Sequence, residues 1–372
     1  MRHMRRVAHV TSAHSAKDIR IFHKECVTLS KAGYQVTLIA PNREDAIVSG
    51  VRIVPIPFAE TRASRLLRNV PLAFKKCLQV DAEVYHLHDP ELLPIGFALR
   101  MLGKKVIYDA HEDFVADIGR KDYLPLYLRG PLRWLVEALE AGAKRWFTGV
   151  VAATPSIERH LRGRRTVVVN NYVVLEDACT PTSFALRPRQ VIYIGAISVE
   201  RGIFEMVRAI ALLNENHNGP VTELVIAGEF SPPNLREAVS SEPGWRYVHY
   251  VGVVDHAVIS DLLASARVAL LLFHPGPNHE NACPNKLFEY LAAGIPIVMS
   301  NFPFWRGLLH DCRCSVDVDP LDPMEISESV RWLLCHPEEA EEMGRRGHAA
   351  AVDRFSWTSQ AQVLEKFYET YV

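Results

Sequence analysis

The sequence lacks several features that would place it in a restricted class of proteins. It contains no run of about 18 apolar residues, the length that a membrane-spanning helix needs. Its basic start, MRHMRRVAHVTSAHS, has no apolar core of signal-peptide length. The seven cysteines are an odd number spread from Cys26 to Cys335, which favours reduced thiols over a disulfide framework. The formal net charge of −1 gives no overall attraction for nucleic acid. We therefore expect a cytoplasmic protein without a nucleic-acid partner, whose charged sites are local.

Alternation of apolar strands with helical segments is the main positive signal. Runs rich in Val, Ile and Leu lie at 7–10, 35–40, 51–55, 84–87, 105–108, 150–153 and 166–169. A second alternation begins with a strand at 190–194 and continues to a helix at 323–335. This pattern predicts an α/β fold with two doubly wound parallel sheets, each covered by helices on both faces. We predict an N-terminal domain over 1–185, a C-terminal domain over 186–355 and a C-terminal helix over 356–372 that packs back on the first domain.

The first predicted strand is followed by SAHSAKDIR, which contains no glycine. A phosphate-wrapping GxGxxG loop is therefore absent, and the sequence gives little support for a nicotinamide- or flavin-dependent enzyme. Ligands of doubly wound sheets bind beyond the carboxyl ends of the strands. The polar residues at those positions in the first domain are candidates for binding the acceptor of a reaction, although loop solvation or helix capping explains them equally well: His14, Asp18, Arg20, His88 and Asp89.

The second domain offers two cations at comparable positions. In YIGAISVERG, Arg201 follows a strand and a glycine, where a guanidinium suits a phosphate oxygen. In NHENACPNKLFEYLAAGIPIVMS, Lys286 lies near the start of a helix predicted over 285–293, and Glu289 follows one turn later. A helix N-terminus and two cations would together clamp a diphosphate. The alternative is an ordinary surface Lys–Glu pair. Gly195 would permit close backbone approach, and the residues after two later strands would contact the nucleotide: Glu229, Phe230 and Val253.

The segments HLHDPE and YDAHED contain His and Asp residues that are metal ligands elsewhere. Their spacing matches no helix-borne HExxH motif, so we predict no metal site.

Two basic segments of the first domain are candidates for a membrane surface. Residues 62–78 contain five Arg and Lys residues and no acid, interleaved with apolar side chains. Residues 128–146 have apolar residues at helical spacing beside basic ones but include Glu137 and Glu140. Basic amphipathic helices bind anionic lipid. For 128–146 we favour a core-facing stripe with a solvated face, and for 62–78 the two interpretations stay open.

Several of these segments resemble a known family. VIYIGAISVERG and NACPNKLFEYLAAGIPIV resemble the donor-site motifs of the retaining glycosyltransferases of family 4 (glycosyl transferases group 1), which have the GT-B fold. HLHDPELLPIG, VIYDAHED and IFHKECVTLSKAGYQVTLIAP are similar to segments of that family's first domain. The similarity covers nearly the whole chain. It implies two Rossmann-like domains facing each other across a cleft, a nucleotide-sugar donor in the cleft, no metal and no separate cofactor.

The resemblance also implies residue roles. Glu289 matches the second acid of the E-x7-E motif, expected on the donor ribose, whereas the first acid falls on Asn281, beside Glu280. Arg201 and Lys286 match diphosphate-binding cations, and His111 matches a histidine near the donor sugar. We assign His111, Arg201 and Lys286 to catalysis. The family's common Arg after the first strand's Gly is Ala196 here.

The reaction implied is front-face sugar transfer with retention, from a UDP-sugar or a GDP-sugar to a glycan or lipid-linked acceptor, in the synthesis of a surface polysaccharide or glycolipid. Cations and a helix N-terminus would stabilise the departing nucleoside diphosphate. Two alternatives remain: a nucleotide-sugar epimerase of similar shape, and a non-catalytic sugar-nucleotide-binding subunit. The membrane contact through 62–78 would place the enzyme on the cytoplasmic face of the inner membrane.

Overall fold

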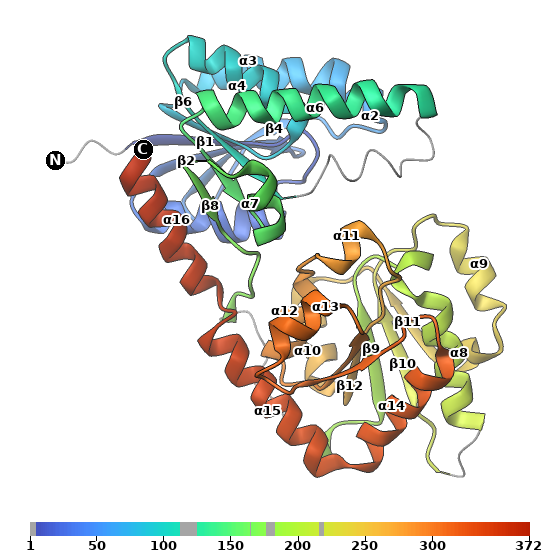
Figure 1. Ribbon diagram of the computed structural model, residues 1–372. Helices are drawn as coiled ribbons and strands as arrows, with labels where there is room; N and C mark the ends of the chain where they lie inside the picture. The colour runs from blue at the N-terminus through green and yellow to red at the C-terminus, as the bar shows by residue number, and fades with distance from the viewer. Residues whose placement is uncertain (1–4, 112–124, 164, 176–182, 216–218) are drawn as a thin grey trace. The chain divides into compact units, whose positions relative to one another are not determined.

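The computed structural model describes residues 5–111, 125–163, 165–175, 183–215 and 219–372. By its internal contacts the chain divides into two units (Figure 1): unit 1, Met1–Asn171 with Trp357–Val372, and unit 2, Tyr172–Ser356. The division at residue 171 comes earlier than the boundary at 185 that we expected from the sequence, and the C-terminal helix belongs to unit 1. Within the described ranges, no helix combines the length and the apolar character needed to cross a membrane.

Unit 1 is built on an eight-stranded sheet with the order β3-β4-β2-β1-β5-β6-β7-β8. Every neighbouring pair is parallel except the edge pair β3–β4. The strand order reverses between β1 and β5, so the carboxyl ends of these two strands form the topological switch point, where doubly wound sheets bind ligands. The strands are β1 Arg6–Val10, β2 Gln35–Pro41, β3 Ala46–Val48, β4 Val51–Ile56, β5 Val84–Leu87, β6 Lys105–Ala110, β7 Gly149–Ala152 and β8 Thr166–Val168.

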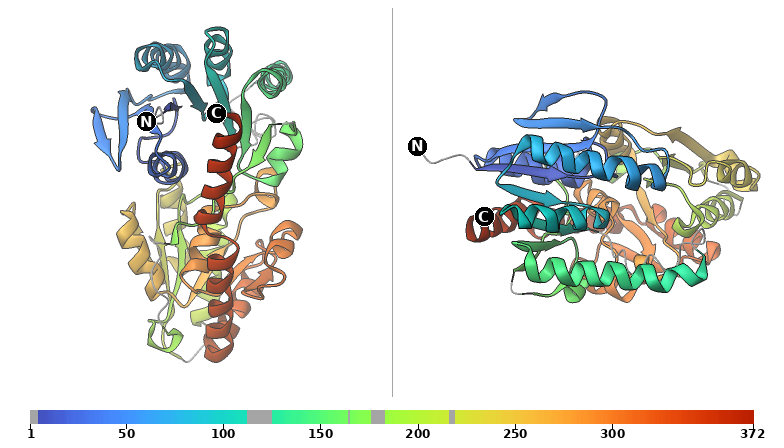
Figure 2. Two further views of the ribbon diagram at one scale, coloured as in Figure 1. Left: turned by 90° about the vertical axis from the view of Figure 1, so that its left-hand side faces the viewer. Right: turned by 90° about the horizontal axis from the view of Figure 1, so that it is seen from above.

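Helices cover both faces of this sheet. Helices α3, α4 and α6 lie side by side over one face (Figure 2), and α16 packs against η1, α1 and β8. The segment η1 is a π-helix, which closes hydrogen bonds five residues apart and continues directly into α1. The helices are η1 Ile19–Cys26, α1 Val27–Lys31, α2 Arg62–Ser64, η2 Arg65–Asn69, α3 Val70–Val80, η3 Pro90–Leu92, α4 Leu93–Met101, α6 Leu126–Trp146, α7 Pro155–Leu161 and α16 Trp357–Tyr371.

Unit 2 has a six-stranded, fully parallel sheet with the order β11-β10-β9-β12-β13-β14. Numbered from the unit's own start, this is the Rossmann order 3-2-1-4-5-6, with the switch point between β9 and β12. The strands are β9 Gln190–Ile194, β10 Glu223–Ala227, β11 Val248–Gly252, β12 Val268–Leu271, β13 Ile297–Ser300 and β14 Ser315–Val318.

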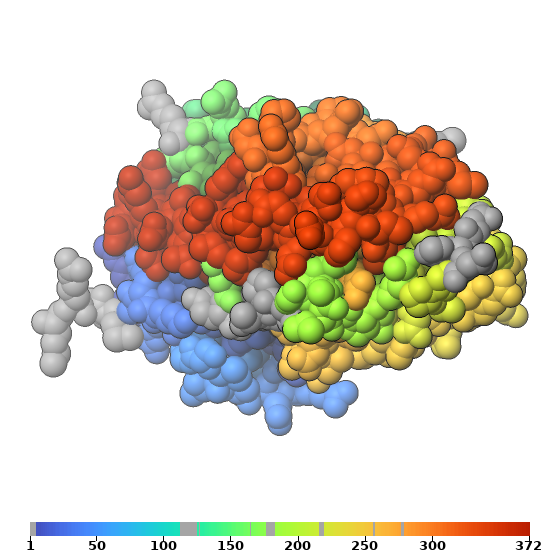
Figure 3. All heavy atoms as spheres, turned by 90° about the horizontal axis from the view of Figure 1, so that it is seen from below, coloured from blue at the N-terminus to red at the C-terminus, as the bar shows by residue number. Residues whose placement is uncertain are grey.

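The helices of unit 2 follow the strands in regular alternation. Two of them, α14 and α15, form part of its outer surface (Figure 3). The helices are η5 Phe184–Leu186, η6 Val199–Arg201, α8 Ile203–Glu215, α9 Leu235–Ser240, η7 Pro243–Tyr247, α10 His256–Ser265, α11 Pro277–Glu280, α12 Asn285–Ala292, α13 Pro303–Leu309, α14 Pro323–Cys335 and α15 Pro337–Asp353.

The two parallel-dominated sheets confirm the predicted α/β class. The strands predicted from Val- and Ile-rich runs are all present, because strands buried on both faces of a sheet consist mostly of apolar residues. On α6, the expected core-facing stripe includes the buried Val136 and Ala143. Its other face is more apolar than a typical solvated face, since Tyr127 and Trp134 are 76% and 70% exposed.

Candidate functional site

Lys286 is the central residue of the predicted site in unit 2. It lies in the first turn of α12 and is buried, although it is a lysine. Its Nζ donates a hydrogen bond to the hydroxyl of Tyr193, at 2.8 Å, and lies 4.0 Å from the centroid of the same ring. The ring of Phe273, just after β12, is 5.4 Å away. The ammonium group is therefore held between the ends of β9 and β12, at the switch point.

Arg201, the last residue of η6, lies near the same aromatic residues as Lys286. Its guanidinium donates to the carbonyl oxygen of Ala196 at 3.1 Å and lies 5.5 Å from the centroid of Phe273. The hydroxyl of Tyr193 donates to that same carbonyl at 2.7 Å. A hydrogen-bond chain thus runs from Lys286 through Tyr193 to Ala196, where Arg201 also donates. The two predicted cations do come together.

Gly195 makes this approach possible. A Cβ at residue 195 would lie 2.8 Å from Lys286 Nζ, and φ of +107° is a conformation that other residues rarely adopt. Gly202 has a similar role after η6, since a Cβ there would lie 2.3 Å from the Leu272 carbonyl oxygen. Both glycines allow backbone and side chains to converge at the switch point.

The electrostatics of Lys286 suit an anionic ligand. Burial, and then the nearby charge of Arg201, lower the pKa of Lys286 well below its usual value, while Glu289 acts in the opposite direction. A diphosphate beside both cations would supply the missing negative charge and favour the ammonium form. The N-terminus of α12 adds its own positive dipole end at the same point.

The other residues predicted to bind the donor have mixed positions. Glu289 is half-buried one turn beyond Lys286, as expected. Glu280 closes α11 half-buried, and Asn281 is exposed immediately after it. Glu229 is exposed and Val253 is 75% exposed, each just beyond the end of a strand.

Phe230 differs from the prediction, because it is 5% exposed. Its ring packs on Tyr250, with the centroids 5.2 Å apart, inside the hydrophobic core of unit 2. The described structure therefore gives Phe230 a packing role and presents little of it to a ligand.

In unit 1, His14 and His111 form a half-buried pair. Their Nε2 atoms are 3.1 Å apart, and His14 Nδ1 lies 3.5 Å from the carboxylate of Asp18. Asp18 also accepts from the backbone N–H of Ile21, which caps η1. Although burial opposes ionisation, the hydrogen bonds from His14 and Ile21 lower the pKa of Asp18 to about 2. Asp18 thus both caps the helix and orients His14.

Asp89 shapes the loop that follows β1. Its carboxylate accepts from the hydroxyl of Thr11 at 2.9 Å and from the backbone N–H and the hydroxyl of Ser12. It is 3% exposed, and His14 Nε2 is 3.7 Å away. Asp89 therefore fixes the backbone from which His14 projects.

Arg20 and His88 are buried where the sequence led us to expect contact with an acceptor. Arg20 makes a bidentate hydrogen bond to Asp109, at 2.9 and 2.7 Å, and donates to the carbonyl oxygen of Val169. His88 Nδ1 lies 3.0 Å from the same carboxylate. Although burial favours the neutral acid, Arg20 and His88 hold the pKa of Asp109 well below its usual range. With exposed fractions of 4% and 1%, Arg20 and His88 support the site from below its surface.

Sequence reasoning missed Tyr193 and Phe273, and it considered Asp109 only as a possible metal ligand of the segment YDAHED. Tyr193 and Phe273 looked like ordinary core residues of apolar strands, and only their spatial relation to Lys286 shows that they contact the cation. Asp109 ends an apolar run, and its partners come from residues 20 and 88. A further signal was the presence of Arg20, Lys24 and Glu25 in a helical segment that also contains Ile19, Ile21 and Phe22.

Comparison with known protein families agrees with this geometry. Residues 20–177 match the model of Glycosyltransferase Family 4, and residues 181–350 match that of Glycosyl transferases group 1. The chain belongs to the group 1 glycosyltransferases. The family resemblance noted in the sequence is thereby confirmed, and the unit 2 switch point lies within the group 1 match.

Two relatives and one solved structure illustrate the similarity. A glycogen synthase of Mycobacterium tuberculosis is 27% identical over 182 residues, which are 49% of this chain and 42% of that protein. A phosphatidyl-myo-inositol mannosyltransferase of Mycobacterium leprae is 24% identical over 359 residues, 91% of this chain and 88% of that one. The structure of sucrose-phosphate synthase from Thermosynechococcus elongatus aligns with a TM-score of 0.78 at 17% identity and covers 98% of both chains. This last likeness supports the GT-B glycosyltransferase fold.

Proposed function

We propose that the protein is a retaining glycosyltransferase that moves a sugar from a nucleoside-diphosphate sugar to a glycan or a lipid-linked acceptor. The observation that carries this proposal is the proximity of Lys286 and Arg201 at the switch point, where Arg201 donates to the Ala196 carbonyl and Lys286 is linked to it through the Tyr193 hydroxyl. Such a site recognises a diphosphate through charge and backbone donors. Because these groups recognise the diphosphate and not the base, UDP- and GDP-sugars are both candidate donors.

In the proposed reaction the bond between the anomeric carbon and the diphosphate breaks while the acceptor oxygen bonds to that carbon on the same face. Negative charge develops on the leaving phosphate, where Lys286 and Arg201 stabilise it. A phosphate oxygen takes the proton of the acceptor hydroxyl. Glu289 is proposed to accept from the ribose hydroxyls, and His111 to interact with the donor sugar. The two cations provide the charge neutralisation that a divalent ion supplies in other enzymes, so we propose no catalytic metal.

The acceptor class is proposed from the relatives. One is named a mannosyltransferase of a phosphatidyl-inositol and matches nearly the whole chain, and the other is named a glycogen synthase. These names support a lipid-linked or glycan acceptor and a role in surface polysaccharide or glycolipid synthesis.

We propose that residues 62–78 contact the cytoplasmic surface of the inner membrane. In this segment Leu66 and Leu67 are 50% and 81% exposed, and Arg62 and Arg68 are exposed beside them. Exposed leucines flanked by arginines match the surface of an anionic bilayer, with apolar groups entering the interface and guanidinium groups pairing with headgroups.

A panel assay tests the proposed function. The protein is incubated with UDP- and GDP-sugars, with and without glycan and lipid acceptors, while nucleotide release and thermal stability are followed. The proposal predicts acceptor-dependent release of one nucleoside diphosphate. An epimerase would change the sugar without net nucleotide release, and a non-catalytic subunit would gain thermal stability without turnover. The absence of both turnover and a nucleotide-induced rise in the melting temperature would refute the proposal.

A further inference from the structure

A second group of polar side chains lies inside unit 1, beneath the switch point. His9 lies in β1 next to His86 of β5, and the two residues are partners in the strand register. His88 follows β5, and Glu25 enters from η1. The side chains of His9, Glu25, His86 and His88 are all at most 1% exposed. The reaction proposed above uses none of their ring nitrogens or carboxylate oxygens directly.

Four donor atoms of these residues converge on one point. His9 Nδ1 lies 2.9 Å from His88 Nε2 and 3.9 Å from Glu25 Oε2, and His86 Nδ1 lies 3.8 Å from the same oxygen. One donor atom from each of the four residues lies within 4.8 Å of the donor atoms of the other three. A tetrahedral zinc ion with bonds of about 2.1 Å has ligand atoms about 3.4 Å apart. The three separations of 2.9, 3.9 and 3.8 Å bracket that value, so these atoms are close to tetrahedral spacing.

His88 is already oriented as a metal ligand. Its Nδ1 lies 3.0 Å from the Asp109 carboxylate, which Arg20 holds with two hydrogen bonds. An ionised carboxylate can only accept, so His88 carries its proton on Nδ1 and directs the Nε2 lone pair towards the cluster. A carboxylate behind a histidine is the usual outer shell of a metal-bound imidazole.

Glu25 is the residue that most needs an explanation. Neither of its carboxylate oxygens has a hydrogen-bond partner among the described residues, although both are buried. Arg20 Nε is 3.2 Å away, but its N–H donates to Asp109. The π-helical hydrogen bonding of η1 brings residues 20 and 25 onto one face and so directs Glu25 inward. Burial and then the charge of Asp109 raise the pKa of Glu25, so its carboxyl group becomes an ionised ligand only with a cation beside it.

Although the spacing within HLHDPE led us to predict no metal site, we propose that His9, Glu25, His86 and His88 bind a structural zinc ion. Three imidazoles and one carboxylate, with no thiolate, are a donor set that zinc prefers in tetrahedral geometry. The four protein ligands fill the coordination sphere, so the ion has no open position for a substrate and acts in stability. It links β1, η1 and β5. The hydroxyl of Tyr368 lies 2.9 Å from His86 Nδ1 in this structure. When zinc binds, His86 Nδ1 coordinates the ion in place of this hydrogen bond.

The overlapping set of His88, Asp109 and His111 is a weaker candidate. Its ligand atoms also lie within 4.8 Å of one another. However, Asp109 already accepts two hydrogen bonds from Arg20 and one from His88, so its oxygens are occupied. The cluster around Glu25 has the oxygens that lack partners in the described structure, and we therefore assign the ion to it.

Metal analysis of the full-length protein tests the assignment. The chain is purified without chelators or a metal-binding tag, and then refolded from denaturant with and without zinc, because a buried ion exchanges slowly in the native state. We expect about one zinc per chain, and a melting temperature about 5–10 °C higher after refolding with zinc. Refolding with Co²⁺ should give visible d–d bands without thiolate charge transfer. Wild-type protein that takes up no stoichiometric metal by either route overturns the proposal.

Glu25→Gln separates the zinc site from a metal-free cluster. Glutamine has the shape of a neutral glutamate, so a metal-free cluster tolerates it, whereas a zinc site loses a ligand. We expect the variant to lose zinc and to melt like zinc-free wild type. Glu140→Gln is the matched control, since Glu140 is buried in the same unit and accepts from Tyr108, and it should keep the metal. Full zinc content in Glu25→Gln contradicts the assignment. Metal content is independent of nucleotide release, so this proposal and the proposed function can fail separately.

Discussion

Lys286 is the only lysine among residues 172–356, and it is buried. A lysine is rarely buried without a strong reason, because desolvation of its charge is unfavourable. Here Lys286 lies close to Arg201 at the switch point, where doubly wound sheets bind ligands, so we attribute its burial to ligand binding. At the scale of single residues, the proposed function therefore depends on two cations and the acid one turn away.

Removing Arg201 or Glu289 should impair catalysis. We expect Arg201→Ala and Glu289→Ala each to reduce kcat/KM at least about 10-fold, equivalent to about 1.4 kcal/mol of barrier, through lost contacts to diphosphate and ribose. Steady-state kinetics with the best donor measures this. Arg208→Ala is the control, since Arg208 pairs with Glu242 on the surface. Wild-type kinetics in both site variants would show that the motif is misassigned.

Lys286→Met should stabilise the protein without ligand. Methionine fits an apolar environment without a desolvated charge, so we expect the free energy of unfolding to rise by about 1–2 kcal/mol at neutral pH. Urea unfolding measures the difference between variant and wild type.

The pH dependence of that difference follows from the lowered pKa of Lys286. Between the folded and the unfolded pKa, the unfolded chain binds more protons, so wild-type stability rises with pH relative to the variant. The advantage of Lys286→Met should therefore be largest at low pH and narrow as the pH approaches 10. An advantage that widens with pH would contradict the burial of a cation at this position.

At the scale of elements, the sequence predicted the sheets better than the helices that cover them. Strands such as β9 and β12 are nearly continuous apolar runs, and such runs predict buried strands directly. Helix α15 was missed because its buried face consists largely of small residues, including Ala340, Gly344 and Gly347, which give little hydrophobic periodicity. A Cβ at residue 344 would lie 2.2 Å from the carbonyl oxygen of Gly294, so close packing, not hydrophobicity, defines that face.

The polar network of unit 1 was beyond sequence reasoning for a different reason. His9, Glu25 and Asp109 come from three separate elements, β1, η1 and β6, so no single segment shows that they lie together. Their juxtaposition depends on the strand order, in which β1 pairs with β5 and β5 with β6. The fold class predicts the strand order, but it does not predict in which direction individual side chains beneath the switch point are oriented.

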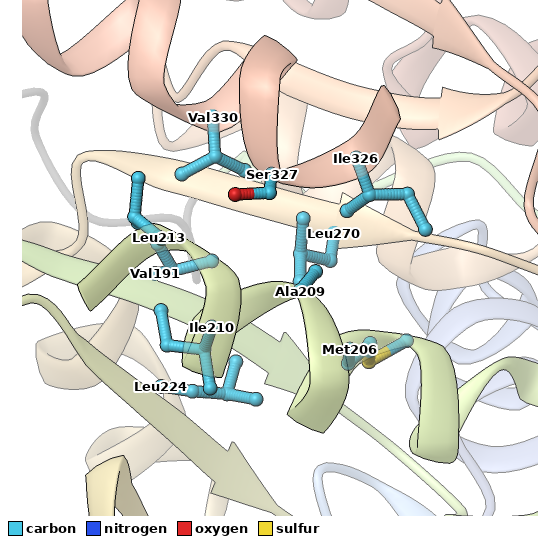
Figure 4. Close-up of a pocket in the computed structure, with 10 residues that line it drawn as sticks. All are labelled: Val191, Met206, Ala209, Ile210, Leu213, Leu224, Leu270, Ile326, Ser327 and Val330. Atoms are coloured by element: carbon cyan, nitrogen blue, oxygen red, sulfur yellow. The ribbon is translucent and has the colours of Figure 1, made fainter. Parts of the chain in front are cut away.

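Packing between α8 and α14 provides a stability prediction. These helices and the sheet enclose a small apolar cavity lined by Met206, Ile210, Leu270 and Val330 (Figure 4). Ser327 also lines it, and its hydroxyl is buried without a hydrogen-bond partner among the described residues. We expect Ser327→Ala to raise the free energy of unfolding by about 1 kcal/mol, because the desolvation penalty of the hydroxyl is removed.

Ser300→Ala is the matched comparison. Ser300 is equally buried, but its hydroxyl donates to the carbonyl oxygen of Phe273 at 2.8 Å. Its removal should lower stability by about 1 kcal/mol. Chemical denaturation of both variants tests the pair, and equal losses in the two would refute the unpaired state of Ser327.

At the scale of the whole molecule, two doubly wound units each carry polar residues at their own switch point. Unit 2 holds the cations proposed for the donor, and unit 1 holds His14, His111 and the basic segment 62–78. The predicted class and the family are confirmed, while the donor base, sugar and acceptor depend on side chains that generic strand-end motifs do not specify. Asn281, where the family pattern has an acid, is exposed after α11 and is a natural place to look for donor-sugar selectivity.

Membrane contact is a property of the whole molecule that can be measured directly. We expect co-sedimentation with vesicles containing anionic lipid, weakened by salt because charge screening acts on exposed arginines. Replacing Leu66 and Leu67 with Ser should reduce binding, whereas replacing the exposed Leu186 of unit 2 with Ser should not. Binding that is absent, or that survives in the double variant, would remove segment 62–78 as the contact.

The measurement closest to the central claim is a calorimetric titration of UDP and GDP into wild type, Lys286→Met and Arg201→Ala. The site described here predicts that one nucleotide binds to wild type with a stoichiometry of one, and that each variant weakens its Kd at least about 10-fold, or about 1.4 kcal/mol. The lowered pKa of Lys286 also predicts proton uptake on binding, seen as a dependence of the measured enthalpy on the buffer. Equal affinity in all three proteins would contradict a diphosphate site at the switch point of unit 2.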